Sequence, residues 1–113
     1  MSKYNNRHVK ADGYTFDSRA EYHRYCELRM LERAGHICDL EVHPRYELMP
    51  GGAVGEWRWR KKQYEADFAY TDTATGARVV EDVKGHRTAL YKLKRDWFLS
   101  LHGDRLEFRE IEA

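Results

Sequence analysis

The segment Val80-Glu81-Asp82-Val83-Lys84-Gly85 holds the residue types best suited to chemistry in this chain. Side chains alternate between the two faces of a β-strand, so Asp82 and Lys84 point the same way, roughly 6.6 Å apart along the strand. A carboxylate and an ammonium group placed together just before a glycine can hold a metal ion and a water molecule. The alternative is an ordinary surface ion pair, which contributes little stability.

A second carboxylate, Asp67, lies in the preceding aromatic segment, residues 64–70. Apolar and aromatic side chains alternate there with Glu65 and Asp67, which predicts a strand that pairs with residues 78–84 as a hairpin. If the register places Asp67 beside Asp82, the two carboxylates repel each other unless a cation lies between them. Mg²⁺ prefers oxygen ligands and keeps several waters, so it suits such a site. The alternative is an outward-facing charge, and Glu65 is either a bystander or an extra ligand.

A third carboxylate, Glu21, lies at the start of the clearest predicted helix. Ser18 is a good N-cap, and Glu21 three residues later has the spacing of a capping box. Tyr25, Leu28 and Leu31 follow at helical spacing and predict one buried face. Glu21 stands at the end of that face, from which it can reach the ends of the strands. Capping the helix as its only role is the alternative.

The remaining elements follow from periodicity and turn residues. We expect an extended arm over residues 1–12, a short strand over 13–16, and a helix that Gly35 ends. Extended segments around Leu40 and over 46–49, a long strand or hairpin arm over 57–68, and a strand over 78–84 come next. A second helix, from Thr88 to about residue 102, carries an apolar stripe of Leu90, Leu93, Trp97 and Leu101. With a final strand near residues 106–108, this predicts an α/β domain with a mixed sheet.

The charge is nearly balanced but unevenly distributed. The 113 residues contain 20 Lys and Arg against 19 Asp and Glu, a net charge of +1. Residues 51–64 carry a net +3, residues 65–83 a net −4, and residues 84–103 a net +4. Solvated surface is one interpretation, and an acidic metal-binding centre between phosphate-binding segments is the other. The candidate phosphate-binding residues are Arg58, Arg60, Lys61, Lys62, Arg87, Lys92, Lys94 and Arg95.

Two further features have both a structural and a functional interpretation. Trp57 and Trp59 alternate with arginines, which is typical of an amphipathic strand, but indole rings can also stack on nucleic-acid bases. His86 follows Lys84 by two residues and is either a loop histidine or a neighbour of the candidate site.

Length and composition limit the class of protein. A chain of 113 residues favours a single domain over residues 1–113. No apolar run approaches the roughly 18 residues of a membrane span, and the start MSKYNNRHVK has no apolar core of a signal peptide. Two cysteines do not make a disulfide framework, which favours a reducing compartment such as the cytoplasm. No glycine-rich phosphate loop is present, so we expect no nucleotide cofactor.

The order of these features resembles the PD-(D/E)XK nuclease superfamily, in which a helix carboxylate, a strand aspartate and a (D/E)-x-K strand precede a basic helix. Longer strings resemble a family of small phage and prophage proteins regarded as endonucleases of this type. These strings are Lys3-Tyr4-Asn5, Asp12-Gly13, Phe16-Asp17-Ser18, Glu21, Arg24-Tyr25, Leu31-Glu32-Arg33-Ala34-Gly35, Pro44-Arg45, Ala66-Asp67-Phe68 and Val80-Glu81-Asp82-Val83-Lys84-Gly85. Ala66 replaces the proline of the superfamily name, which removes no ligand.

The resemblance implies a restriction-endonuclease-like core with the order αβββαβ and a set of site residues. Asp67 and Asp82 are the implied metal ligands, Glu21 the helix carboxylate and Lys84 the motif lysine, with the main-chain carbonyl of Val83 as a further ligand. The implied cofactor is Mg²⁺, for which Mn²⁺ can substitute.

The implied activity is metal-dependent hydrolysis of DNA phosphodiester bonds. Small phage-encoded members of the superfamily often act on branched or junction DNA, so the resemblance implies phage or prophage DNA metabolism in the bacterial cytoplasm. One site in each chain favours a homodimer for cutting two strands. Two alternatives are a non-catalytic nucleic-acid-binding accessory protein with the same fold and a protein–protein module of a phage particle.

Overall fold

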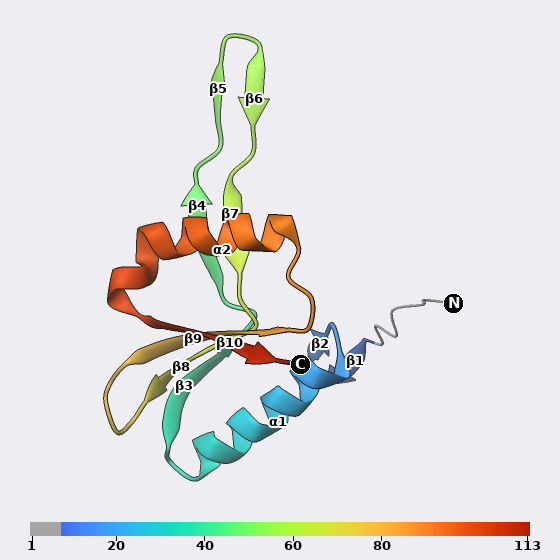
Figure 1. Ribbon diagram of the computed structural model, residues 1–113, viewed down its shortest axis with the longest axis vertical. Helices are drawn as coiled ribbons and strands as arrows, with labels where there is room; N and C mark the ends of the chain where they lie inside the picture. Colours follow the sequence, from blue (N-terminus) through green and yellow to red (C-terminus); the bar gives the residue numbers. More distant parts are fainter. Residues whose placement is uncertain (1–7) are drawn as a thin grey trace.

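A four-stranded mixed sheet forms the centre of the computed structural model, which describes residues 8–113 (Figure 1). Its strands lie in the order β10 (Glu107–Glu112), β9 (Arg78–Lys84), β8 (Phe68–Asp72) and β3 (Ile37–Val42). β9 is parallel to β10 and antiparallel to β8, which is antiparallel to β3. With α1 (Arg19–Arg33) before β3 and α2 (Ala89–His102) after β9, the predicted mixed α/β class is confirmed.

The N-terminal segment is more than the predicted extended arm. β1 (Val9–Ala11) pairs with β2 (Tyr14–Phe16) as an antiparallel hairpin, so residues 9–11 are hydrogen-bonded to the predicted short strand. Residues 1–7 of the predicted arm lie outside the described residues. Over residues 8–113, neither helix has the length and the apolar content needed to cross a membrane.

Four strands are inserted between β3 and β8. β4 (Arg45–Met49) pairs with β7 (Lys62–Glu65), and β5 (Gly52–Val54) pairs with β6 (Trp57–Trp59) farther out. Figure 1 shows the β5–β6 hairpin projecting past α2, away from the central sheet. The predicted long strand or hairpin arm over residues 57–68 is correct only as hairpin arms: the stretch is not one continuous strand but supplies β6, β7 and the start of β8.

The strand is interrupted between β7 and β8 because the chain changes sheets there. The amide of Ala66 donates to the carbonyl of Pro44 (3.0 Å), and the amide of His43 donates to the carbonyl of Asp67 (2.9 Å). These two bonds tie together the segments that leave β3 and enter β8. The chain turns there from the β4–β7 pair into the central sheet, which leaves Asp67 directly before β8.

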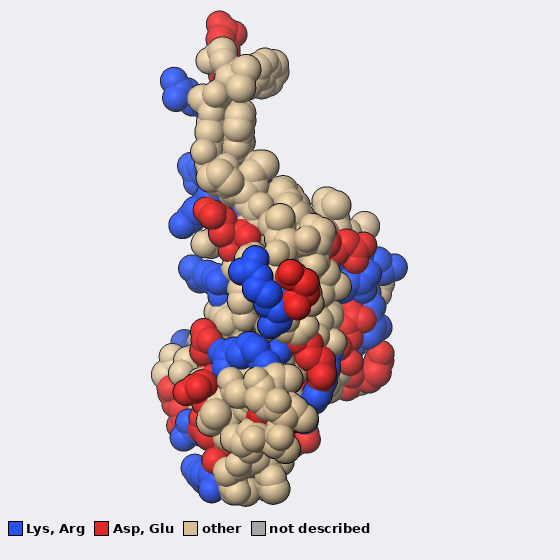
Figure 2. Space-filling view, turned by 90° about the vertical axis from the view of Figure 1, so that its left-hand side faces the viewer, with Lys and Arg blue, Asp and Glu red and all other residues tan. Residues whose placement is uncertain are grey.

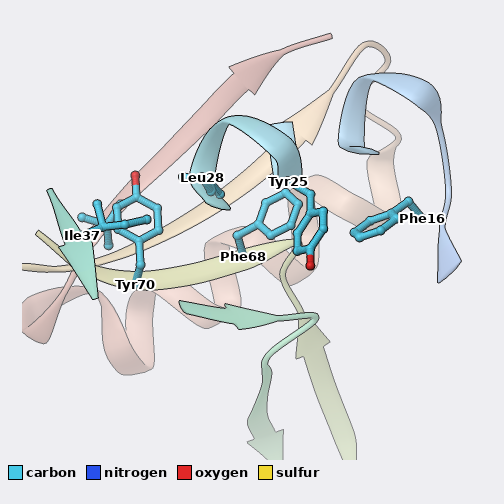
Figure 3. Packing of buried hydrophobic residues seen from close by; sticks show 7 residues of the cluster. Phe16, Tyr25, Leu28, Ile37, Phe68 and Tyr70 are labelled. Carbon is cyan, nitrogen blue, oxygen red and sulfur yellow. The ribbon is translucent and has the colours of Figure 1, made fainter. Parts of the chain in front are cut away.

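α1 forms as the capping residues predict and covers one face of the sheet. The Ser18 side chain accepts from the amide of Glu21 (3.2 Å), and Gly35 takes a positive φ of +81° after the helix. Figure 3 shows the buried cluster beneath the helix, in which Tyr25 and Leu28 meet Phe68 of β8. The predicted buried face of α1 is confirmed.

α2 buries chiefly Phe98 and not the predicted stripe, of which Trp97 packs partly against the same cluster. Leu90 and Leu93 are 62% and 60% exposed, whereas Phe98 is fully buried. The Phe98 ring stacks on Tyr64 of β7 with 4.7 Å between centroids and lies 4.8 Å from the ring of Tyr46 of β4. The helix has two apolar stripes, and the aromatic one is buried because β4 and β7 present aromatic rings to it.

The burial of Phe98 and the exposure of Leu93 predict unequal losses of stability for two substitutions on α2. Phe98→Ala removes a fully buried ring and should lower the free energy of unfolding by about 3–5 kcal/mol. Leu93→Ala removes an exposed side chain and should change it by less than about 0.5 kcal/mol. Urea denaturation of both variants measures the difference, and equal destabilisation would contradict the assigned face.

Candidate functional site

Asp67 and Asp82 lie at the same end of the β8–β9 pair. Phe68 is opposite Glu81 in the register, and Asp67 directly precedes Phe68. The amide of Asp67 donates to the carbonyl of Glu81 (3.1 Å), and the amide of Val83 donates to Oδ2 of Asp67 (2.7 Å). The backbone of β9 therefore holds the Asp67 carboxylate in place, at the amide of the residue that follows Asp82.

Asp82 is a buried carboxylate with little to stabilise its charge. The residue is 1% exposed, and neither carboxylate oxygen accepts a hydrogen bond from a described residue. Nζ of Lys84 lies 3.3 Å from Oδ1 as an ion pair, which confirms that these two side chains share a face. Burial raises the pKa of Asp82 to about 6 although Lys84 opposes the shift. Such an unsatisfied buried carboxylate is an expected feature of a cation site.

The surroundings raise the pKa of both Asp67 and Lys84, for different reasons. Burial and the nearby charge of Glu21 raise the pKa of Asp67 to about 6, against the amide of Val83 and the ammonium of Lys84. Burial alone would lower the pKa of Lys84, but Asp82 and Asp67 outweigh it and raise the pKa. Lys84 therefore stays charged at neutral pH and offsets part of the carboxylate repulsion.

Glu21 reaches the sheet end from α1, as its position predicted. The side chain is buried; its Oε2 accepts from the amide of Asp17 (3.2 Å), and its Oε1 lies 2.6 Å from Nε2 of His43. The charge of Glu21 raises the pKa of both Asp67 and Asp82. Glu21 is thus electrostatically part of the site, although both of its oxygens already have partners.

His43 is a site residue that the sequence pattern did not reveal. It follows β3 with a φ of +56°, a left-handed conformation that histidine adopts more readily than most residues. This conformation turns the chain so that the imidazole meets Glu21. The one local signal for it was its position before Pro44, where the predicted strand breaks.

Glu81, the neighbour of Asp82, has the opposite role. It is fully buried on the α1 side of the sheet, where Nε and Nη2 of Arg24 donate to its two oxygens at 2.8 and 2.6 Å. The hydroxyl of Tyr70 also donates to it, and burial followed by this bond raises the pKa of Tyr70 to about 12. Because every oxygen of Glu81 is bonded, this residue fixes α1 to the sheet and has no free oxygen for a ligand.

An open groove lies beside the carboxylates. It has a volume of about 720 Å³ and is lined by residues that include Ser18, Val83, Lys84 and His86. Nζ of Lys84 lies 4.8 Å from the ring centroid of Tyr91 on α2, which limits its motion. Lys84 therefore stands between the buried carboxylates and a groove that is open to a ligand, and the exposed His86 lines the same groove.

Comparison with known proteins identifies the family. The model of a family described as "Protein of unknown function (DUF1064)" matches residues 1–112. The chain belongs to the DUF1064 family. No curated protein and no solved structure matches it.

The sheet end of this DUF1064 chain offers a cation two carboxylates at most, Asp67 and Asp82, without a rearrangement of Glu21. Within residues 8–113, no three His, Cys, Asp or Glu side chains are grouped closely enough to hold a metal ion together. Asp82 nevertheless offers two oxygens without hydrogen bonds, and Asp67 is held at the same sheet end by the amide of Val83. Mg²⁺ is commonly held by one or two carboxylates with water completing the shell. Glu21 would have to release Asp17 or His43 to bind directly.

Two of the four predicted phosphate-binding residues of the second basic block are engaged within the DUF1064 fold. Arg87 pairs with Glu110 (3.2 Å) and Glu112 (2.7 Å), and Arg95 pairs with Glu110 and Asp96 at 3.1 Å each. No acidic partner among residues 8–113 lies within ion-pair distance of Arg58, Arg60, Lys61 or Lys62 of the first block, nor of Lys92 and Lys94 of the second. Glu65 pairs with Arg45 at 3.0 Å.

The buried carboxylates predict how stability depends on pH without metal. Asp82 has a pKa of about 6 in the folded chain against 3.8 for an ordinary exposed aspartate, so the folded state binds its proton more tightly. Stability from this group is full below pH 4 and is lost as pH rises to about 6. Asp82→Asn should therefore reduce the loss of unfolding free energy between pH 4.5 and 7.5 by about 2 kcal/mol.

Urea denaturation in EDTA at the two pH values measures this effect. Glu65→Gln, which neutralises a half-exposed carboxylate, is the matched control and should follow the wild type. If the unfolding free energies of the wild type and Asp82→Asn change by the same amount between pH 4.5 and 7.5, the assigned burial of this charge is wrong.

Proposed function

We propose that this chain is a metal-dependent endodeoxyribonuclease with a restriction-endonuclease-like core of the PD-(D/E)XK type. The observation that carries the proposal is the buried, unsatisfied carboxylate of Asp82, with Asp67 at the same sheet end and Lys84 ion-paired with Asp82 beside an open groove. The order α1, β3, β8, β9, α2, β10 in the central sheet agrees with the fold that the resemblance implies.

The reaction class follows from the charges at the sheet end. Asp67 and Asp82 would hold Mg²⁺ or Mn²⁺, with the carbonyl of Val83 as a further oxygen ligand. When bound, the ion supplies stabilisation of the charge that develops on the phosphate and lowers the pKa of an attacking water. Lys84 neutralises charge on the scissile phosphate or orients that water, and Glu21 adds negative charge that favours cation binding.

The substrate class that we propose is branched or junction DNA, in phage or prophage DNA metabolism in the bacterial cytoplasm. Each chain has one such sheet end, so cutting two strands would take two chains, and we propose a homodimer. One observation favours a second candidate function, a non-catalytic nucleic-acid-binding accessory: both oxygens of Glu21 are already bonded to Asp17 and His43.

A nicking assay distinguishes the two functions. The wild type should nick branched DNA with Mg²⁺ and not with EDTA, and Asp82→Asn should reduce nicking to the EDTA level. Lys84→Met removes one positive charge at the phosphate and should slow the reaction about 10²–10³-fold. Glu65→Gln is the matched control and should cut at the wild-type rate.

Duplex, flap and four-way junction DNA are compared in the same assay. Cutting that persists in EDTA or in Asp82→Asn would overturn the nuclease proposal, and binding of these DNAs without any cutting would favour the accessory function.

Metal binding is tested separately from cleavage. At pH 7.5, Mg²⁺ at 100 times its dissociation constant should stabilise the wild type by about 2.7 kcal/mol, because only the folded chain holds the carboxylates together. Asp82→Asn should lose this stabilisation, and Glu65→Gln should keep it. Thermal unfolding with increasing Mg²⁺ measures both, and an equal rise in Tm for Asp82→Asn and wild type would place the ion elsewhere.

A further inference from the structure

The β5–β6 hairpin projects from a base that the core holds rigidly. Tyr46 of β4 and Tyr64 of β7 are opposite each other below the hairpin, and both rings pack on Phe98. Gly55 begins the two-residue turn at the tip with a φ of +59°, the conformation of a type II′ hairpin turn. Figure 1 shows that the tip lies well away from the central sheet. The hairpin is therefore a firmly attached element whose own surface faces solvent.

Of the two tryptophans of the hairpin, only Trp59 has contacts that explain its presence. The Trp59 ring lies over Gly52, where a Cβ atom would come within 2.6 Å of it, and its Nε1 donates to the carbonyl of Pro50 (3.2 Å). Trp59 thus has a structural role inside the hairpin. Trp57 is 80% exposed at the tip, opposite Val54, and no described residue hydrogen-bonds or stacks with its ring. Folding does not account for an indole in this position.

The charge of the hairpin indicates the chemistry of its partner. Arg58 lies on β6 between the tryptophans, and Arg60 and Lys61 follow it; all three are exposed. Their segment, residues 51–64, has a net charge of +3. Figure 2 shows Lys and Arg side chains projecting from one side of the hairpin. A partner that matches both features is anionic and has flat aromatic faces.

Nucleic acid with an unpaired base has both properties. Its phosphates attract the cations, and the face of an unpaired base accepts stacking by an aromatic ring. Within a duplex, each base face is covered by the next base pair. The indole at the tip can therefore reach a base only where the duplex ends or branches.

We propose that Trp57 stacks on an unpaired base while Arg58, Arg60 and Lys61 bind the flanking phosphates, so that the hairpin selects DNA with a single-stranded or branched segment. This inference rests on the proposed function in one respect, that the chain acts on DNA.

The test measures binding in the full-length Asp82→Asn chain in EDTA, with fluorescein-labelled single-stranded, forked and fully duplex DNA. Adding Trp57→Ala should raise the dissociation constant for single-stranded and forked DNA about 5- to 150-fold, the effect of losing one stacked base. The constant for duplex DNA should change less than about twofold. Trp57→Phe keeps an aromatic ring and should retain most of the affinity. Leu93→Ala removes an apolar side chain that is also exposed, at 60%, from α2 and is the control.

A salt titration tests the phosphate contacts independently. For single-stranded DNA, the slope of the logarithm of the dissociation constant against the logarithm of salt concentration should fall by about 0.7 for each of Arg58→Gln and Lys61→Gln. Circular dichroism and thermal unfolding show whether each variant folds.

The outcomes separate this inference from the nuclease proposal. If Trp57→Ala weakens forked DNA selectively but the wild type never cuts, the inference holds and the nuclease proposal fails. If the wild type cuts and Trp57→Ala leaves forked binding unchanged, or weakens duplex equally, the inference is overturned and the nuclease proposal stands. Absence of binding to every DNA also overturns it and leaves the hairpin to a protein partner.

Discussion

The paired hydrogen bonds from Arg24 to Glu81 are the interaction on which the arrangement of this molecule depends. Removing a carboxylate from water is costly unless partners replace the lost hydration. Glu81 on the α1 side of β9 receives two guanidinium bonds, so α1 can dock on the sheet only where Arg24 reaches it. Because Glu21 lies three residues before Arg24, almost one helical turn away, the same docking brings its carboxylate to the sheet end beside Asp67 and Asp82.

The carboxylates at the sheet end destabilise the fold at neutral pH. Asp82 and Asp67 are buried with pKa values raised to about 6, so at neutral pH the fold holds repelling charges together. The aromatic packing on both sides of the sheet provides the free energy that keeps them there. A proton or a cation relieves the same repulsion, so the two compete, and cation binding should weaken as pH falls through 6. Natural sequences keep such local conflicts mainly where function requires them.

Strand periodicity explains which parts of the site could be predicted. The two-residue repeat of a strand is rigid, so it correctly placed Asp82 with Lys84 and brought Asp67 to the same end of the hairpin. The change of sheet at residues 66–67 could not be seen, because the alternation of apolar residues continues across it while the pairing partner changes from β4 to β3. The buried face of α2 was predicted wrongly for a related reason. Stripes through Leu93 and through Phe98 are both apolar, and only the aromatic rings of β4 and β7 decide between them.

Charge summed along the chain is a poor guide to charge available in space. The segment 84–103 has a net +4, yet Arg87 and Arg95 are matched by Glu110, which β10 brings alongside when it pairs in parallel with β9. The smaller +3 of residues 51–64 has no such neighbour, because the β5–β6 hairpin leaves the body of the molecule. Long-range attraction of an anionic polymer depends on unpaired charge. The hairpin, with the smaller sum, is therefore the stronger electrostatic feature, and the near-neutral total of +1 conceals it.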